Sequence, residues 1–361
     1  MRQRLFVCLA ILGILGIAVS ASAEGLFRGD TANTGIFPVS RLPQGVLAWK
    51  IPTSARIAGS PVVVGNTVFF GNAAGELVAS DVRTGQGRWA VRLDGSVLGS
   101  PAVAGQTLFV GTYEGTLYAL ASAQGTLRWH VSTGAAIFGA PAVVGSTVYV
   151  GNALGQLRAL DVGSGRERWV FLGNGWFAGT PASGEGLLFV GDHGGRFRAL
   201  DPAQGKEVWG ANAGGSVDPS PVVSGGWVFY GSDGGSIAAV QIRKVIPKWQ
   251  VKLGAGVSSS LGVAGGLVFA GCHDGQVYAL DARTGAVRWT FLTEGPVLSS
   301  PAYARGTLYF GSSGGILYAV DAASGRELWR FATGSEITGA PVLGEGMVFF
   351  GTADGTLFAL R

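Results

Sequence analysis

The sequence predicts an all-β fold, an eight-bladed β-propeller of four-stranded antiparallel blades whose ring is closed by an N-terminal strand. Three observations predict it. A tryptophan recurs every 40 residues, an aromatic residue keeps a fixed place 20 residues beyond each tryptophan, and glycines follow that aromatic residue in the same register. A period of about 40 residues that holds several short strand patterns is typical of propeller blades.

The repeat runs through the chain without an insertion. The periodic tryptophans are Trp49, Trp89, Trp129, Trp169, Trp209, Trp249, Trp289 and Trp329. The periodic aromatic residues are Phe69, Phe109, Tyr149, Phe189, Phe229, Phe269, Tyr309 and Phe349. The composition, with 13% charged residues, 47% hydrophobic residues and 62 glycines, suits a β-rich protein with many tight turns.

The first copy shows how one blade is built. Its apolar patterns predict strand A over 57–64, strand B over 67–71, strand C over 76–80 and strand D over 88–93. Strand B is apolar on both faces, as expected for a blade that packs between two neighbours. Because the strands alternate in direction, the D–A and B–C loops share one face of the ring, which we call the B–C/D–A face. The A–B and C–D loops share the other.

Aspartates and glycines mark the C–D turns. Asp81 is followed four residues later by Gly85, and the same aspartate recurs at Asp161, Asp201, Asp281 and Asp321. Aspartate accepts hydrogen bonds from the backbone two or three residues on, and glycine adopts a positive φ at little cost. Because these aspartates are periodic, we interpret them as turn formers rather than catalytic groups. The copy at 241–249 lacks both residues, so it is either a drifted repeat or a basic patch for an acidic partner.

The two ends of the repeat predict how the ring closes. The last copy stops just after its strand C, whereas 46–50, which carries Trp49, reads as a strand D without partners. We therefore expect residues 45–361 to form the propeller, with 45–52 completing blade 8. Closure in this way removes exposed sheet edges. Residues 24–44 form an N-terminal lead-in, and residues 1–23 read as a signal peptide.

The signal-peptide prediction rests on three features. Arg2 and Arg4 form a positive end, 5–19 is apolar but short for a membrane span, and Ala21-Ser22-Ala23 fits a cleavage site. The alternative is an uncleaved membrane anchor. Cys8 does not end the apolar stretch, so no lipid-attachment cysteine is apparent. We expect a periplasmic or secreted monomer with no membrane segment after cleavage, and no nucleic-acid partner because no long basic run is present.

The repeat resembles that of the pyrroloquinoline-quinone-type (PQQ-like) propellers. Residues 59–63, 68–72 and 75–89 read GSPVV, VFFGN and GELVASDVRTGQGRW, and 26–35 reads LFRGDTANTG, which is similar to the lead-in of bacterial members. The Arg28-Gly29-Asp30 tripeptide within it we interpret as coincidence rather than an adhesion motif.

This resemblance implies the propeller fold and two alternative functions. One branch comprises quinoprotein dehydrogenases that bind PQQ and calcium; the other comprises non-enzymatic periplasmic scaffolds such as the outer-membrane assembly factor BamB. Uniform blades and the lack of a cysteine pair resemble the second branch, so we expect no enzyme activity and no cofactor, with PQQ and calcium as the alternative. BamB itself is typically a lipoprotein, and the chain departs from it there.

The candidate site lies on the B–C/D–A face, where the copies differ most. Departures from an internal consensus on one face are what a binding site added to a scaffold would look like. The candidate residues for binding a partner or ligand are Tyr113, Glu114, Trp176, Phe177, Asp192, His193, Asp233, His273 and Asp274.

Two of these groups have alternatives. The Trp176-Phe177 pair lies outside the periodic register, and it is either an anchor for a protein partner or a plug for the central channel. Cys272-His273-Asp274 combines metal-ligating residue types, but no close ligand spacing supports a metal site, and a solvated loop is the simpler interpretation. No Ser-His-Asp arrangement is apparent, so we assign no catalytic residues.

Together these patterns favour a non-catalytic periplasmic scaffold for protein partners in the cell envelope. The candidate partners are the subunits that assemble outer-membrane β-barrel proteins. The alternatives are a PQQ-binding quinoprotein or sensor, and a secreted propeller that binds a small ligand in its axial channel.

Overall fold

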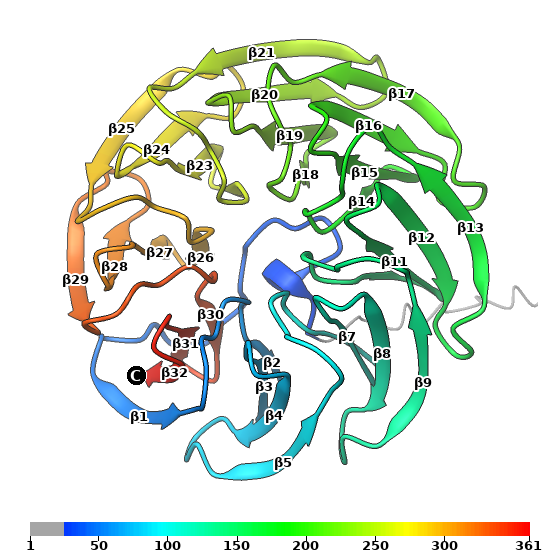
Figure 1. The fold of residues 1–361 in the computed structure, drawn as a ribbon. Coiled ribbons are helices and arrows are strands. Elements are labelled where there is room, and N and C mark those ends of the chain that lie inside the picture. The colour runs from blue at the N-terminus through cyan, green and yellow to red at the C-terminus, as the bar shows by residue number, and fades with distance from the viewer. Residues whose placement is uncertain (1–24) are drawn as a thin grey trace, which may run out of the picture.

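The structure, a computed structural model, describes residues 25–361, so the signal peptide predicted over 1–23 lies outside the described residues. Eight four-stranded antiparallel sheets surround a central axis, as Figure 1 shows. The prediction of an eight-bladed propeller is confirmed. Over residues 25–361, no helix has the length and apolar character needed to cross a membrane.

Each blade runs from strand A near the axis to strand D at the rim. Blade 1 is β2 (Val62–Val64), β3 (Thr67–Gly71), β4 (Glu76–Asp81) and β5 (Gly87–Arg92). Blade 2 is β6 (Ala102–Ala104), β7 (Thr107–Gly111), β8 (Thr116–Ala121) and β9 (Leu127–Ser132). Blade 3 is β10 (Ala142–Val144), β11 (Thr147–Gly151), β12 (Gln156–Asp161) and β13 (Glu167–Leu172). Blade 4 is β14 (Ala182–Gly184), β15 (Leu187–Gly191), β16 (Arg196–Leu200) and β17 (Glu207–Asn212).

The second half repeats this pattern. Blade 5 is β18 (Val222–Ser224), β19 (Trp227–Gly231), β20 (Ser236–Gln241) and β21 (Ile246–Lys252). Blade 6 is β22 (Gly262–Ala264), β23 (Leu267–Gly271), β24 (Gln276–Asp281) and β25 (Val287–Leu292). Blade 7 is β26 (Ala302–Ala304), β27 (Thr307–Gly311), β28 (Ile316–Asp321) and β29 (Glu327–Ala332). Blade 8 is β30 (Val342–Gly344), β31 (Met347–Gly351), β32 (Thr356–Leu360) and β1 (Leu47–Pro52).

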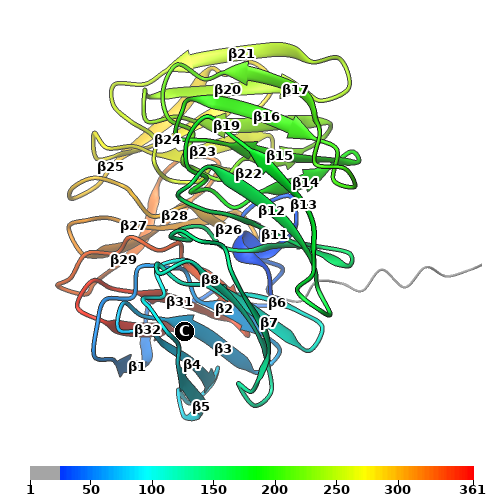
Figure 2. The ribbon, with the colours of Figure 1, turned by 45° about the vertical axis from the view of Figure 1, so that its right-hand side comes forward.

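Blade 8 joins the two ends of the ring. Strand β1 pairs antiparallel with β32, with Trp49 opposite Ala359, and Figure 2 shows the two strands side by side. Two backbone hydrogen bonds between Val46 and Arg361 extend the pairing. The predicted closure by an N-terminal strand is confirmed.

Strand A is shorter than predicted. The sequence predicted a strand over 57–64, but β2 begins only at Val62. Pro61 has no N–H to donate, and the N–H of Ser60 is bonded to the Ser100 hydroxyl of the next blade. The segment before Val62 is therefore held by contacts between blades rather than by a strand partner.

The periodic tryptophans join neighbouring blades. In seven copies the indole N–H donates to a backbone carbonyl at 3.0–3.2 Å, which belongs to the next blade in six copies and to the lead-in for Trp329. The pairs are Trp49–Val82, Trp89–Ser122, Trp129–Val162, Trp169–Pro202, Trp249–Ala282, Trp289–Ala322 and Trp329–Pro43. A turn glycine of that blade packs on the indole: a Cβ on Gly165 would lie 2.8 Å from the Trp129 ring. The aspartates form these turns as predicted; Asp81 accepts hydrogen bonds from the backbone N–H groups of Arg83 and Thr84.

The joint between blades 4 and 5 departs from this pattern. Among the described residues, the buried indole N–H of Trp209 has no hydrogen-bond partner. The position that is glycine elsewhere is Val245, which is held at φ 52°. A β-branched side chain is strained in this left-handed region. The copy that lacks the Asp and Gly signals is thus the one with the weakened inter-blade contact.

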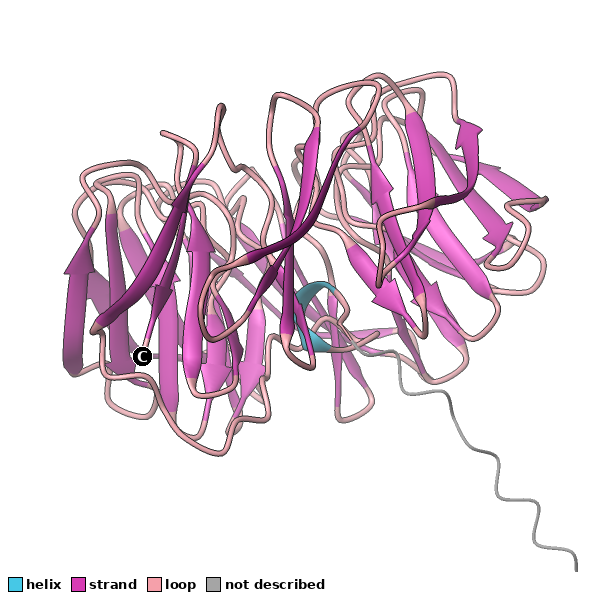
Figure 3. Ribbon diagram, turned by 90° about the horizontal axis from the view of Figure 1, so that it is seen from below, coloured by secondary structure: helices cyan, strands magenta, loops and turns pink. Residues whose placement is uncertain are grey.

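The lead-in crosses the centre of the ring. It contains the 3₁₀ helix η1 (Phe27–Gly29), which lies at the axis in Figure 1 and inside the ring of strands in Figure 3. Its carbonyl groups accept hydrogen bonds from the innermost strands of five blades, donated by the N–H groups of Val103, Ser183, Val223, Val263 and Tyr303.

Arg28 and Asn33 attach the lead-in most firmly. Both side chains are buried. Arg28 donates from Nη2 to the carbonyls of Leu261 and Pro301 at 2.6 and 2.9 Å, and Asn33 donates to the carbonyl of Thr180 at 3.1 Å. Burial lowers the pKa of Arg28 to about 9, with Asp30 opposing the shift. A guanidinium held in this way is not accessible to an adhesion receptor, in line with our interpretation of the Arg28-Gly29-Asp30 tripeptide.

Candidate functional site

An aliphatic column holds the D–A loops in place. The equivalent positions Ile57, Val97, Ile137, Phe177, Val217, Val257, Val297 and Ile337 are all 0% exposed. Phe177, in the loop between blades 3 and 4, is the aromatic member of this otherwise aliphatic column and packs against Phe171, with ring centroids 6.5 Å apart. The expectation that Phe177 contacts a partner therefore needs correction, because its side chain is in the core beneath the face.

Trp176 points away from that core and joins an aromatic row. The row consists of Tyr113, Phe138, Trp176 and His193, which come from loops of blades 2, 3 and 4. Ring centroids are separated by 5.8 Å from Tyr113 to Phe138, 5.9 Å from Phe138 to Trp176, and 4.2 Å from Trp176 to His193. Tyr113 is 48% exposed and Trp176 39%. Three predicted site residues are thus brought together on one surface.

Sequence reasoning missed Phe138, the residue that links Tyr113 to Trp176. A signal was present: the equivalent positions Ala58, Leu98, Ala178, Asp218, Ser258, Leu298 and Thr338 hold no other aromatic residue. Phe138 is therefore a departure from the internal consensus of the same kind as Trp176.

His193 and Asp218 extend the row toward the axis. His193 Nδ1 lies 3.1 Å from both carboxylate oxygens of Asp218, and both side chains are partly exposed. Burial raises the pKa of Asp218, and the hydrogen bond with His193 partly opposes this rise. Asp218 is thus a half-buried carboxylate next to the aromatic ring of His193.

The loop that carries Trp176 is fastened by a buried ion pair in blade 4. Asp192 is fully buried, pairs with Arg198 and accepts a hydrogen bond from the backbone N–H of Asn174 at 2.8 Å. Arg198 also donates to the Asn174 side chain. The expectation that Asp192 is a contact residue is therefore corrected: it lies in the B–C turn and holds the Trp176 loop from below.

His273 and Asp274 form hydrogen bonds with residues outside the aromatic row. His273 Nε2 is 2.7 Å from the Ser258 hydroxyl, and Asp274 accepts a 2.6 Å hydrogen bond from Tyr278. Burial and this bond raise the pKa of Tyr278 above its usual range. Cys272 is buried, and burial raises the pKa of its thiol. Within residues 25–361, no group of three His, Cys, Asp or Glu side chains is arranged to hold a metal ion.

The loops of the B–C/D–A face are strongly acidic. Asp192 is paired with Arg198, but Glu114 and Asp233 are exposed and share the face with other carboxylates. The same loops hold one arginine, Arg56. The carboxylates are Asp94, Glu114, Asp218, Asp233, Asp274, Glu294, Glu336 and Asp354. Arg330, at an adjoining strand, pairs with Glu294, so the loops themselves carry an excess of carboxylates, which favours cations near them.

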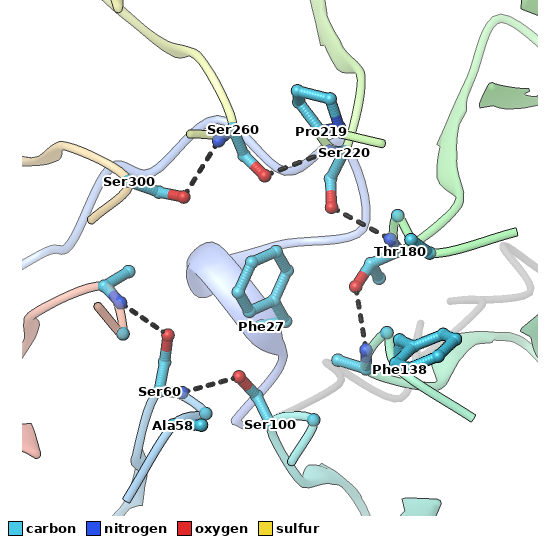
Figure 4. A pocket seen from close by; sticks show the side chains of 18 of the residues that line it. Phe27, Ala58, Ser60, Ser100, Phe138, Thr180, Pro219, Ser220, Ser260 and Ser300 are labelled. Atoms are coloured by element: carbon cyan, nitrogen blue, oxygen red, sulfur yellow. Dashed lines mark hydrogen bonds between the residues drawn. The ribbon is translucent and has the colours of Figure 1, made fainter. Parts of the chain in front are cut away.

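A pocket of about 170 Å³ lies on the axis of the ring. A ring of hydrogen bonds between blades surrounds it, in which backbone N–H groups donate to hydroxyls of the next blade at 2.8–3.1 Å (Figure 4); the acceptors are Ser60, Ser100, Thr180, Ser220, Ser260 and Ser300. Ala140 and Ala340 occupy the two positions without a hydroxyl. Phe27 of the lead-in lies in the middle of this ring and also lines the pocket.

The channel is thus filled by the lead-in rather than by Trp176-Phe177, which answers one of the alternatives left open by the sequence. Leu98, Phe138, Asp218, Ser258 and Thr338 are among the residues that line the pocket on the loop side. Of the lining residues in the described chain, Asp218 is the one that carries a charge.

These features define a PQQ-like β-propeller: uniform 40-residue blades, tryptophan joints between them and an axial site on the loop face. The chain belongs to the family described as outer membrane protein assembly factor BamB, which it matches over residues 39–171, 171–293 and 273–361. It has no significant match among curated protein sequences.

Solved structures share the fold at low identity. BamB from Moraxella catarrhalis is 19% identical, with a TM-score of 0.77 over 88% of this chain and 99% of that one. A europium-containing methanol dehydrogenase is 16% identical, with a TM-score of 0.80 over 92% of this chain and 91% of that one. Quinohemoprotein alcohol dehydrogenase from Comamonas testosteroni is 16% identical, with a TM-score of 0.80 over 94% and 80%. The fold is therefore common to BamB and to dehydrogenases.

Proposed function

We propose that this chain is a non-catalytic periplasmic scaffold that binds protein partners during the assembly of outer-membrane β-barrel proteins. Membership of the BamB family supports the process, and the aromatic row supports the mode of action. Tyr113 and Trp176 expose large aromatic surfaces, and the loop of Trp176 has a rigid base, because Phe177, Asp192 and Arg198 are buried beneath it. Rigid, partly exposed aromatic side chains are typical centres of protein–protein interfaces.

The enzyme alternative fits the axial pocket poorly. PQQ is a tricarboxylate, so its binding calls for cationic or hydrogen-bond-donating groups. The lining residues of the described chain include no lysine or arginine, and the one charged group, Asp218, has the same sign as the cofactor. The pocket is also smaller than the roughly 300–1,000 Å³ typical of organic ligand sites. We therefore propose no step through PQQ, and titration of the protein with PQQ and calcium tests this directly.

Site-specific photocrosslinking tests the scaffold proposal. A photoreactive phenylalanine analogue replaces Tyr113 on the aromatic row or, as a control, Arg83 in a C–D turn of the opposite face. In envelopes of the native host, position 113 should crosslink to a subunit of the barrel assembly machinery, and Trp176→Ala should reduce that product. Crosslinks to such subunits from position 83 alone, or from neither position, would contradict the proposed face.

A further inference from the structure

The loop side of the axial pocket places a carboxylate beside aromatic rings. Asp218 and Phe138 both line the pocket. Trp176 contacts Phe138 on one side and His193 on the other, and His193 in turn bonds to Asp218. Aromatic faces attract cations through their quadrupoles, and a nearby carboxylate strengthens that attraction.

The carboxylate lacks a permanent cationic partner. Within the described residues, no lysine or arginine forms an ion pair with Asp218, whose side chain is 27% exposed and bonded to His193. A half-buried carboxylate has lost part of its hydration and gains from a cation that replaces it. The acidic loops around the pocket add a potential that concentrates cations at this face.

The size of the pocket limits the ligand. A volume of about 170 Å³ accommodates the end of one side chain rather than an organic cofactor. Phe27 lies across the axis in the middle of the hydroxyl ring, so the ligand must approach from the loop side. The lining residues beyond Asp218 are neutral, and a single positive charge is what the site can compensate.

We propose that the loop side of the axial pocket binds one guanidinium or ammonium group, with Asp218 as its counter-ion and Phe138, which Trp176 contacts from outside the pocket, as its aromatic wall. The inference rests on the proposed function for the source of that group, an arginine or lysine side chain presented by a protein partner. A small free organic cation is the other source of the same chemistry.

A titration of the purified, ¹⁵N-labelled protein tests the proposal. The probes are an acetylated, amidated Gly-Gly-Arg-Gly-Gly peptide, the same peptide with neutral citrulline in place of arginine, and methylguanidinium. The readout is the indole N–H resonance of Trp176, assigned from its loss in Trp176→Phe. The arginine peptide should shift this resonance and bind about tenfold or more tightly than the citrulline peptide, because the charge is the main difference between them.

Two variants locate the charge that matters. Asp218→Asn should weaken the arginine peptide about tenfold to 100-fold, the usual effect of removing a charge-assisted hydrogen bond. Asp94→Asn removes an exposed carboxylate of the same face outside the pocket and should change the affinity less than threefold. Equal affinities of the arginine and citrulline peptides, or equal effects of the two variants, would overturn the proposal.

The outcomes of these experiments also distinguish the two sources of the cation, and they distinguish the cation site from the scaffold function. Tighter binding of the peptide than of methylguanidinium supports a partner side chain, and equal binding supports a small free cation; both support the cation site. If the titration fails but crosslinking at position 113 succeeds, the cation site is refuted and the scaffold remains. If the titration succeeds and crosslinking fails, the cation site stands without the partner proposed for it.

Discussion

The eight tryptophan joints allow one interaction to be measured inside a single protein. Trp129 and Trp209 occupy the same place in blades 2 and 4, and both are partly buried. The Trp129 indole donates to Val162 at 3.0 Å, whereas the buried Trp209 N–H has no partner. Replacing each with phenylalanine removes a similar volume, and the two variants differ mainly in the fate of the N–H group.

The difference can be worked out in free energy. Trp129→Phe loses a hydrogen bond with a net value of about 1 kcal/mol. Trp209→Phe loses none and removes a buried donor whose unsatisfied state costs about 1–3 kcal/mol. The cost of the smaller ring is common to both. Trp129→Phe should therefore lower the free energy of unfolding by about 2–4 kcal/mol more than Trp209→Phe.

Guanidinium chloride unfolding followed by circular dichroism measures both variants, and the shift in midpoint at constant m-value gives the difference. Trp89→Phe is the control, because its indole is bonded as Trp129 is, and it should behave like Trp129→Phe. If Trp209→Phe proves as destabilising as the other two, the reasoning about the unpaired N–H is refuted.

Further predictions concern the same joints, the ring and the lead-in. Val245→Gly should raise the free energy of unfolding by about 1 kcal/mol, because it relieves a φ of 52°, and an unchanged unfolding midpoint would contradict this. Ala140→Ser and Ala340→Ser each supply a missing hydroxyl acceptor and should add about 0.5–1.5 kcal/mol, measured in the same way. Arg28→Met removes the bonds to the carbonyls of blades 6 and 7 and should cost about 3 kcal/mol, and a cost below 1 kcal/mol would show that the lead-in is attached elsewhere. The Arg168 guanidinium lowers the pKa of Asp161 to about 2, so the stabilisation from this carboxylate is present above about pH 4 and is lost as the pH falls through 2; urea midpoints of wild type and Asp161→Asn should converge over that range.

The fold could be predicted because every repeat carries the same signals. The 40-residue period fixed the number of blades, and the unpartnered strand around Trp49 predicted closure. The beginning of strand A could not be located in this way. An apolar run shows that a segment is buried, but the hydrogen bond from Ser60 to a neighbouring blade decides that the segment is not yet a strand.

The candidate site was predicted in part. Departures from the internal consensus selected Tyr113, Trp176 and His193, and the structure places their rings in one row with Phe138. They also selected Phe177 and Asp192, which do not face a partner. The positions equivalent to Phe177 in the other copies are aliphatic and buried, and those equivalent to Asp192 hold mostly polar residues that form turns. A departure within a buried column changes the packing, whereas one within an exposed column changes the surface.

The path of the lead-in could not be predicted, because its partners are mostly backbone carbonyl and N–H groups that every sequence provides. Arg28 illustrates this. Its contacts to Leu261 and Pro301 join residues more than 230 positions apart, and nothing in the local sequence marks them.

These long-range contacts also bear on how the protein reaches its native state. Residues 25–35 bond to blades 2, 4, 5, 6 and 7, and β1 pairs with β32, which ends at Leu360. Contacts of such high sequence separation slow folding, because a long loop must close before they form. A nascent chain can form single blades as it emerges, but the lead-in has all its partners only after blade 7 is made, and the ring closes only when β32 can pair with β1. Ring closure by β1 and β32 is therefore expected late in folding, after the strands of all eight blades have been made.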